Sequence, residues 1–174
     1  IRMSFLLHPK KTYLTRRTRV PIRYLPRRLT VRDKSRQRSY LNKSRRLYKR
    51  GIYFNRPKVG SFKTRPSPHV ARAMKMYDVS SLAPSSKLAR ASGCQIEGLR
   101  KIVRKGEGAY YSSGSRPNQT PHSWGYARLG SALTGQNAAI VDYTILKKHC
   151  RPGSRALRLA SRIVQNKTQR VNKK

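Results

Sequence analysis

The stretch from Gly106 to Gly135 constrains the fold more than any other part of the chain. It reads GEGAYYSSGSRPNQTPHSWGYARLGSALTG. Thr120 is a good N-cap because its hydroxyl can accept a hydrogen bond from a free amide, and Pro121 suits the first helical position, where no donor is needed. Gly135 suits the left-handed residue that ends a helix. These signals predict a helix between the two.

The composition of this predicted helix indicates that it packs against other helices. Its small residues leave much of the surface nearly flat, so a second backbone can approach closely. They are Gly125, Ala127, Gly130, Ser131 and Ala132. Large side chains supply the apolar area, and we expect them to form the anchor of the core, sealed by two further tyrosines. The anchor residues are Trp124, Tyr126, Leu129 and Leu133, and the tyrosines are Tyr110 and Tyr111.

Charge limits how much of the chain can form such a core. The 174 residues hold 42 Lys and Arg against 5 Asp and Glu, a net charge of +37. Residues 1–68 carry 22 basic residues and one acid, residues 69–150 a net +8, and residues 151–174 another +8. A compact body with this charge repels itself, so acidic or phosphate-bearing partners must surround it. We therefore expect a component of an assembly.

The three segments differ in pattern and predict three regions. Residues 1–68 have no sustained helical period and contain six prolines, which predicts an extended arm, with a short helix around 35–49 left open. Residues 69–150 predict a small helical core domain. Residues 151–174 predict a basic amphipathic helix capped by Ser154, followed by a tail. The expected fold is mainly α, with a long irregular basic N-terminal arm.

Local signals place further helices in the core domain. Residues 70–77 form a candidate first helix, Ser85 or Ser86 caps a second that ends near Gly93, and apolar residues from position 96 onward repeat at helical spacing up to a stop at Gly106. Asp142 is expected to cap a last core helix that runs through Cys150.

Residues 87–102 allow two interpretations. Their small residue, turn glycine and apolar positions are spaced as in a DNA-binding helix-turn-helix, whose second helix would offer Gln95, Glu97, Arg100 and Lys101 to a groove. Gly98 weakens such a helix, and Glu97 would repel phosphate. The preferred interpretation is a helical hairpin that packs on protein.

The loop at residues 110–119 is similarly open to two interpretations. Its amides and Arg116 could bind phosphate, or its tyrosines could stack on bases. It lacks the GxxxxGK[ST] spacing of a nucleotide-binding loop. We prefer a structural role, in which the tyrosines seal the core while Arg116 and Asn118 tie the loop to backbone.

Enzymatic and metal chemistry find little support in the sequence. No pair of carboxylates is spaced for acid and base catalysis, and the two cysteines form no CxxC motif. We expect no enzyme activity, no cofactor, no metal and no small-molecule substrate. The cysteines, Cys94 and Cys150, are expected to be reduced and buried, with a disulfide as the alternative.

The string KGEGAYYSSGSRPNQTPHSWGYARLGSALTG and the following VDYTIL resemble a small domain of virion proteins from large icosahedral DNA viruses of eukaryotes, the group that includes algal viruses and iridoviruses. The resemblance covers residues 86–150. It implies a minor capsid component beneath the major capsid shell, which ties capsomers to one another or to an inner membrane.

The resulting hypothesis is a structural minor capsid protein on the inner face of the capsid, where it cements capsomers through many modest contacts on one chain. Its partners would be the major capsid protein and other minor capsid proteins, with nucleic acid and an anionic inner membrane left open. The rival is a nucleic-acid-binding protein, either ribosomal in an organelle or genome-binding in a virion. The expected partner-binding residues are Arg16, Arg17, Arg27, Arg28, Arg45, Arg46, Arg116, Arg155, Arg158 and Arg162.

Overall fold

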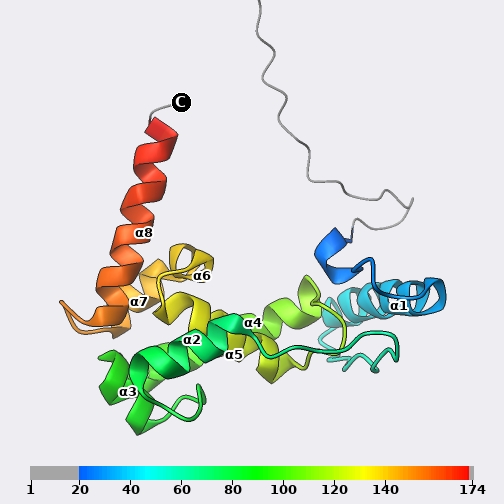
Figure 1. The fold of residues 1–174 in the computed structure, drawn as a ribbon, viewed down its shortest axis with the longest axis horizontal. Helices are drawn as coiled ribbons and strands as arrows, with labels where there is room; N and C mark the ends of the chain where they lie inside the picture. Colours follow the sequence, from blue (N-terminus) through cyan, green and yellow to red (C-terminus); the bar gives the residue numbers. More distant parts are fainter. Residues whose placement is uncertain (1–19, 173–174) are drawn as a thin grey trace, which may run out of the picture. The chain divides into compact units, whose positions relative to one another are not determined.

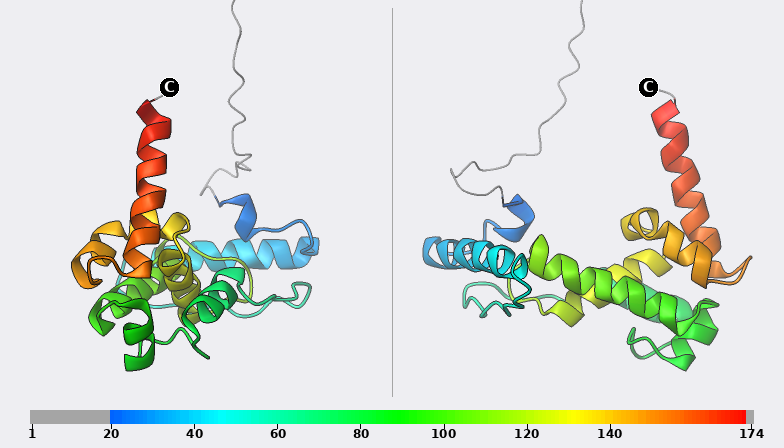
Figure 2. Two further views of the ribbon diagram at one scale, coloured as in Figure 1. Left: turned by 60° about the vertical axis from the view of Figure 1, so that its left-hand side comes forward. Right: turned by 180° about the vertical axis from the view of Figure 1, so that it is seen from behind.

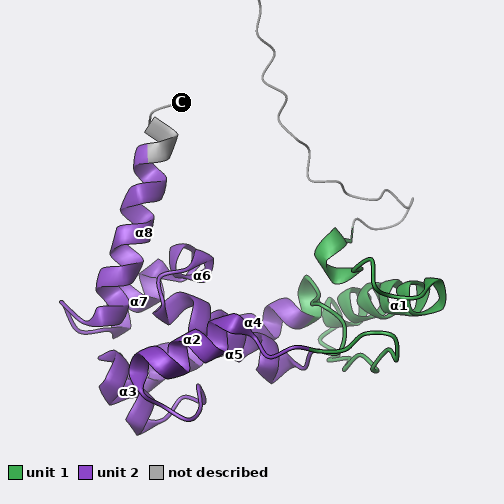
Figure 3. Cartoon of the chain, in the orientation of Figure 1, with its two compact units in different colours: residues 1–64, 111–118 green, residues 65–110, 119–174 purple. Residues whose placement is uncertain are grey.

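The computed structural model describes residues 20–172, and within that range the chain is mainly helical and forms no β-strand. The chain divides into two compact units (Figure 3). Unit 1 comprises residues 1–64 and 111–118, and unit 2 comprises residues 65–110 and 119–174. None of the helices in the described range is long and apolar enough to cross a membrane.

Unit 1 contains a short 3-10 helix, η1 (Ile22–Tyr24), and the long helix α1 (Val31–Tyr48), drawn in blue and cyan in Figure 1. Thr30 caps α1, and its hydroxyl accepts a hydrogen bond from the amide of Asp33. A small set of apolar residues is buried around these helices: Val20, Tyr24, Leu25, Leu29, Leu41 and Val59.

This arrangement corrects the prediction of an extended arm over residues 1–68. Residues 1–19 lie outside the described part of the chain, but residues 20–64 fold into unit 1. The helix left open around residues 35–49 is present as α1, which is longer than expected. The rest of the segment gave no helical signal, and the inward face of α1 is mainly polar, formed by Asp33, Gln37 and Ser44 with Leu41. A search for an apolar helical period detects only part of such a helix.

Unit 2 holds the remaining helices (Figures 1 and 2). They are α2 (Pro68–Tyr77), α3 (Ser86–Ser92), α4 (Ile96–Ser112), α5 (Pro121–Leu133), α6 (Asn137–Val141), α7 (Tyr143–His149) and α8 (Arg155–Asn172). The last two residues of α4 belong to unit 1. The side chains of Ser85, Thr120 and Ser154 accept hydrogen bonds from amides of the helices that follow them, which confirms these three predicted caps.

The flat surface predicted for α5 is confirmed by how closely other helices approach it. A Cβ atom built on Gly130 would lie 2.6 Å from the backbone oxygen of His69, at the start of α2. On the side facing α4, a Cβ atom built on Gly106 would lie 2.7 Å from Cα of Gly125. Gly106 was predicted to end a helix, but α4 continues through it to Ser112. The glycine instead lets α4 pass close to α5.

The core of unit 2 gathers around α5. Leu129 and Leu133 are fully buried, together with Leu99 and Ile102 of α4. Tyr126 is partly buried and packs against this core, and Trp124 is half-buried. Tyr110 and Tyr111 are 1% and 9% exposed.

Candidate polyanion-binding surface

The acidic residues of this chain are largely committed to partners within it. All five lie within the described range, and four of them form ion pairs. The pairs are Asp33 with Arg36, Glu97 with Lys101, Glu107 with His122 when the imidazole is protonated, and Asp142 with both Lys105 and Arg128. The fifth acid, Asp78, is exposed at the left-handed end of α2. The basic surface therefore has few acids of its own chain to neutralise it.

A group of exposed cations lies along the outward face of α1. We name this group the α1 ridge. It consists of Arg32, Arg36, Lys43 and Arg46 on the helix and Arg50 in the turn after it. The helical members are spaced by four, seven and three residues, so they share one face and span roughly 21 Å along the axis at 1.5 Å per residue. All of them are exposed.

The opposite face of α1 is held by buried polar side chains. Gln37 donates to the carbonyl oxygens of Tyr24 and Ser115, at 3.4 and 3.3 Å. Ser44 donates to the carbonyl oxygen of Tyr111, at 3.1 Å. Because each of these partners belongs to unit 1, the helix is fixed in orientation and the ridge is held facing outward.

Asp33 is the single acid of α1, and it faces away from the ridge. Its carboxylate accepts hydrogen bonds from the hydroxyl and the amide of Ser61, at 2.7 and 2.8 Å. The Ser61 hydroxyl and then its amide hold the pKa of Asp33 below its ordinary value. Arg36 forms a long ion pair with this carboxylate, at 3.7 Å, and its own side chain is 48% exposed.

The arginines expected to bind partners in the arm fall into three groups. Arg16 and Arg17 lie outside the described residues, whereas Arg27, Arg28 and Arg46 are exposed. Arg45 is half-buried and donates to the carbonyl oxygen of Ser113 at 2.7 Å. Burial also lowers the pKa of its guanidinium. Arg45 therefore supports unit 1 from within, and sequence alone did not separate it from Arg46.

We predict that Arg45→Gln lowers the free energy of unfolding by about 1 kcal/mol, because it removes a charged donor from a backbone carbonyl. Arg46→Gln should stay within about 0.5 kcal/mol of the wild type. Both variants remove one positive charge, so general self-repulsion changes equally. Urea unfolding followed by circular dichroism measures the difference, and equal midpoints would contradict a structural role for Arg45.

The loop at 111–118 is a structural hub of unit 1. The Asn118 side chain accepts from the amide of Val59 at 2.8 Å and donates to the carbonyl oxygens of Val59 and Phe62, at 3.0 and 2.7 Å. Its backbone has φ +58°, a left-handed conformation that asparagine tolerates. Tyr111 is buried and donates to Asn55, so it offers no open face to a base. Arg116 is exposed.

The helix-turn-helix interpretation of residues 87–102 requires a second helix with a face open to DNA. In the structure, part of that helix is covered by the end of α7. His149, at the end of α7, lies against Gly98, where an added Cβ would be 2.4 Å from the histidine Cβ. The His149 ring is also 2.9 Å from Oε1 of Gln95 and 3.3 Å from Nζ of Lys101. Lys101 also forms an ion pair with Glu97. Three of the four side chains expected to read a groove are therefore engaged within unit 2, as in a packing hairpin.

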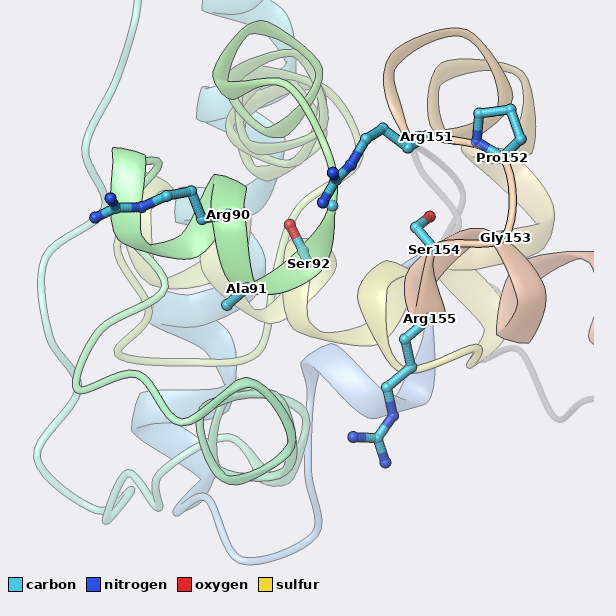
Figure 4. Close-up of a pocket in the computed structure, with 9 residues that line it drawn as sticks. Arg90, Ala91, Ser92, Arg151, Pro152, Gly153, Ser154 and Arg155 are labelled. Carbon is cyan, nitrogen blue, oxygen red and sulfur yellow. The ribbon is translucent and has the colours of Figure 1, made fainter.

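A surface pocket of about 340 Å³ lies between the end of α3 and the turn that leads from α7 into α8. Arg90, Arg151 and Arg155 line it, but Figure 4 shows the side chains of Arg90 and Arg155 extending in different directions. Arg155 donates to the carbonyl oxygen of Met76 at 3.2 Å. The three guanidinium groups do not converge on one point, so this pocket is not a formed anion site. Arg158 and Arg162 are exposed on α8.

The cysteines differ from the predicted reduced thiols. Cys94 and Cys150 form a disulfide that joins the turn before α4 to the end of α7. Two backbone hydrogen bonds flank it, from Gln95 to His149 and from Arg151 to Gly93. The sequence could not distinguish two buried thiols from a disulfide, because only the fold sets the distance between the two cysteines. The described residues contain no cluster of three or more metal-ligating side chains.

Comparison with known proteins gives one match. A family model described as "Family of unknown function (DUF5824)" matches residues 21–149, which is most of the chain. No curated protein and no solved structure matches this chain. The chain therefore belongs to the DUF5824 family, and the match extends through α1 as well as the helices of unit 2 up to the end of α7.

Proposed function

We propose that this protein is a structural component of a virus particle, a minor capsid protein that cements capsomers from the inner face of an icosahedral shell. Its partners are the major capsid protein and other minor capsid proteins, and its role is binding rather than catalysis. The virion assignment depends on the sequence resemblance of residues 86–150, since the family has no described function.

One observation carries the binding part of the proposal. Four of the five acids are paired within the chain, while exposed arginines and lysines cover α1, α4 and α8. A chain with a net charge of +37 gains most when anions outside it surround these cations. Contacts of this kind are individually weak, but many of them on one chain act at high effective concentration.

Crosslinking mass spectrometry on the native assembly that contains the chain tests this function. Lysines 43, 49, 58 and 63 are exposed in unit 1 and report on its neighbours. The proposal expects links from several of them to an acidic coat protein, with more than one copy contacted. Links mainly to ribosomal proteins, or absence of the chain from purified particles, would overturn the capsid assignment.

A further inference from the structure

The α1 ridge has a composition that distinguishes between two kinds of anionic partner. Between its cations, the outward face carries the small polar residues Ser35 and Ser39, both exposed. Its only large exposed apolar residue is Val31, at the first position of the helix. From Arg32 to Arg46 the outward face of α1 is thus cationic and polar. The exposed Ile52 and Tyr53 lie beyond Arg50, and the Lys43 ammonium lies over the ring of Phe54.

Protein interfaces and nucleic-acid interfaces differ in this respect. A stable protein–protein interface has a buried centre rich in aromatic and aliphatic side chains, surrounded by a polar rim. A protein–DNA interface is more polar and far more positive, and arginine and lysine contact phosphates along the backbone. The ridge lacks an apolar centre and aligns its cations along one face of a helix, so it fits phosphates better than the surface of an acidic protein.

The geometry of α1 also suits a rigid, extended anion. The helical part of the ridge spans roughly 21 Å, and the buried contacts of Gln37 and Ser44 hold the helix in place. Because the backbone is fixed before binding, only the side chains lose conformational freedom when the ridge binds. We propose that the outward face of α1 binds the phosphate backbone of a nucleic-acid duplex. This binding activity is independent of the virion assignment.

The test is fluorescence polarisation of the full chain with a labelled DNA duplex of mixed sequence over a series of salt concentrations. The ridge variant combines Arg32→Gln, Arg46→Gln and Arg50→Gln. The control variant combines Arg65→Gln, Arg72→Gln and Arg90→Gln, which are exposed in unit 2. Both variants remove three arginines, and thermal melting confirms that each keeps its fold.

The expected result is a loss of at least about tenfold in affinity for the ridge variant at moderate salt, and a loss of less than about threefold for the control. The slope of log Kobs against log salt concentration should become shallower by roughly 0.9 for each phosphate contact removed. Equal losses for both variants would mean that total charge alone governs binding, and would overturn the proposal.

A second anion identifies the chemistry that the ridge recognises. Poly-glutamate of matched charge competes for a surface that binds carboxylates. The proposal expects poly-glutamate to displace the labelled duplex only at a much higher concentration than unlabelled duplex does. Direct binding of poly-glutamate should be weak and similar for the ridge and control variants. Poly-glutamate that binds as tightly as the duplex, and that loses affinity with the ridge variant, would assign the ridge to an acidic protein instead.

Discussion

Asp142→Ala should lower the free energy of unfolding of this protein by about 3–5 kcal/mol, the range expected when one partner of a buried ion pair is removed. The Asp142 side chain is 0% exposed. Its carboxylate accepts hydrogen bonds from Nε and Nη2 of Arg128, at 2.7 and 2.8 Å, and from Nζ of Lys105, at 2.9 Å. Its loss leaves the Arg128 guanidinium, only 19% exposed, without its carboxylate.

This ion pair joins separate parts of unit 2, which explains the size of the expected effect. Lys105 lies on α4, Arg128 on α5, and Asp142 between α6 and α7. The two-point contact with Arg128 also fixes the orientation of both groups, since the guanidinium and carboxylate planes match. One side chain therefore holds three segments in register.

Glu97→Ala is the matched control, because it also removes one carboxylate from an ion pair in unit 2. Glu97 is 65% exposed and pairs with Lys101 one turn along the same helix. Such an exposed pair contributes little to stability, because solvent and salt screen it. Chemical denaturation of both variants gives the comparison. If Asp142→Ala destabilises the protein no more than Glu97→Ala does, the central role of the buried pair is refuted.

The sequence predicted Asp142 as a helix cap, and the reason for this error is general. An aspartate before a helical segment is a good local signal for an N-cap. Asp142 does precede α7, but its side chain makes no capping hydrogen bond. The partners that it uses, Lys105 and Arg128, are 37 and 14 residues away. Only the packing of α4 and α5 brings them together, and no local pattern records that packing.

Signals within a few residues of each other were more informative. The pair Thr120–Pro121 and the serines at 85 and 154 predicted three helix starts, because a cap and the amide that it binds are neighbours in the chain. Gly93 and Gly135 likewise adopt the positive φ angles that their positions suggested. Most of unit 2 could therefore be predicted element by element.

Unit 1 and the candidate surface were harder to predict for a physical reason. The contacts that hold α1 are hydrogen bonds to residues far along the chain: Gln37 and Ser44 donate to backbone carbonyls, and Asp33 accepts from Ser61. Charge indicated that arginines of this region would bind partners, but it could not separate Arg45, which faces inward, from Arg46, which faces outward. Only the fold assigns cations to the ridge.

Loss of the disulfide should have an effect of similar size to loss of Asp142. Cys94 and Cys150 are 56 residues apart, and a crosslink that closes a loop of this length lowers the entropy of the unfolded chain by the equivalent of about 4 kcal/mol. The double variant Cys94→Ser, Cys150→Ser should unfold at a correspondingly lower urea concentration. Its native fold should persist, because the flanking hydrogen bonds between residues 93–95 and 149–151 do not require the disulfide.

Treatment of the wild type with a reductant separates the crosslink from the side chains. Reduction should lower the stability of the wild type to near that of the double serine variant and leave the variant unchanged. Alkylation of the unfolded, unreduced chain should modify neither cysteine. If both cysteines are alkylated without reduction, and the reductant does not change the unfolding midpoint, the thiols are free as the sequence predicted. Residues 93–95 and 149–151 are then held together by backbone hydrogen bonds and packing alone.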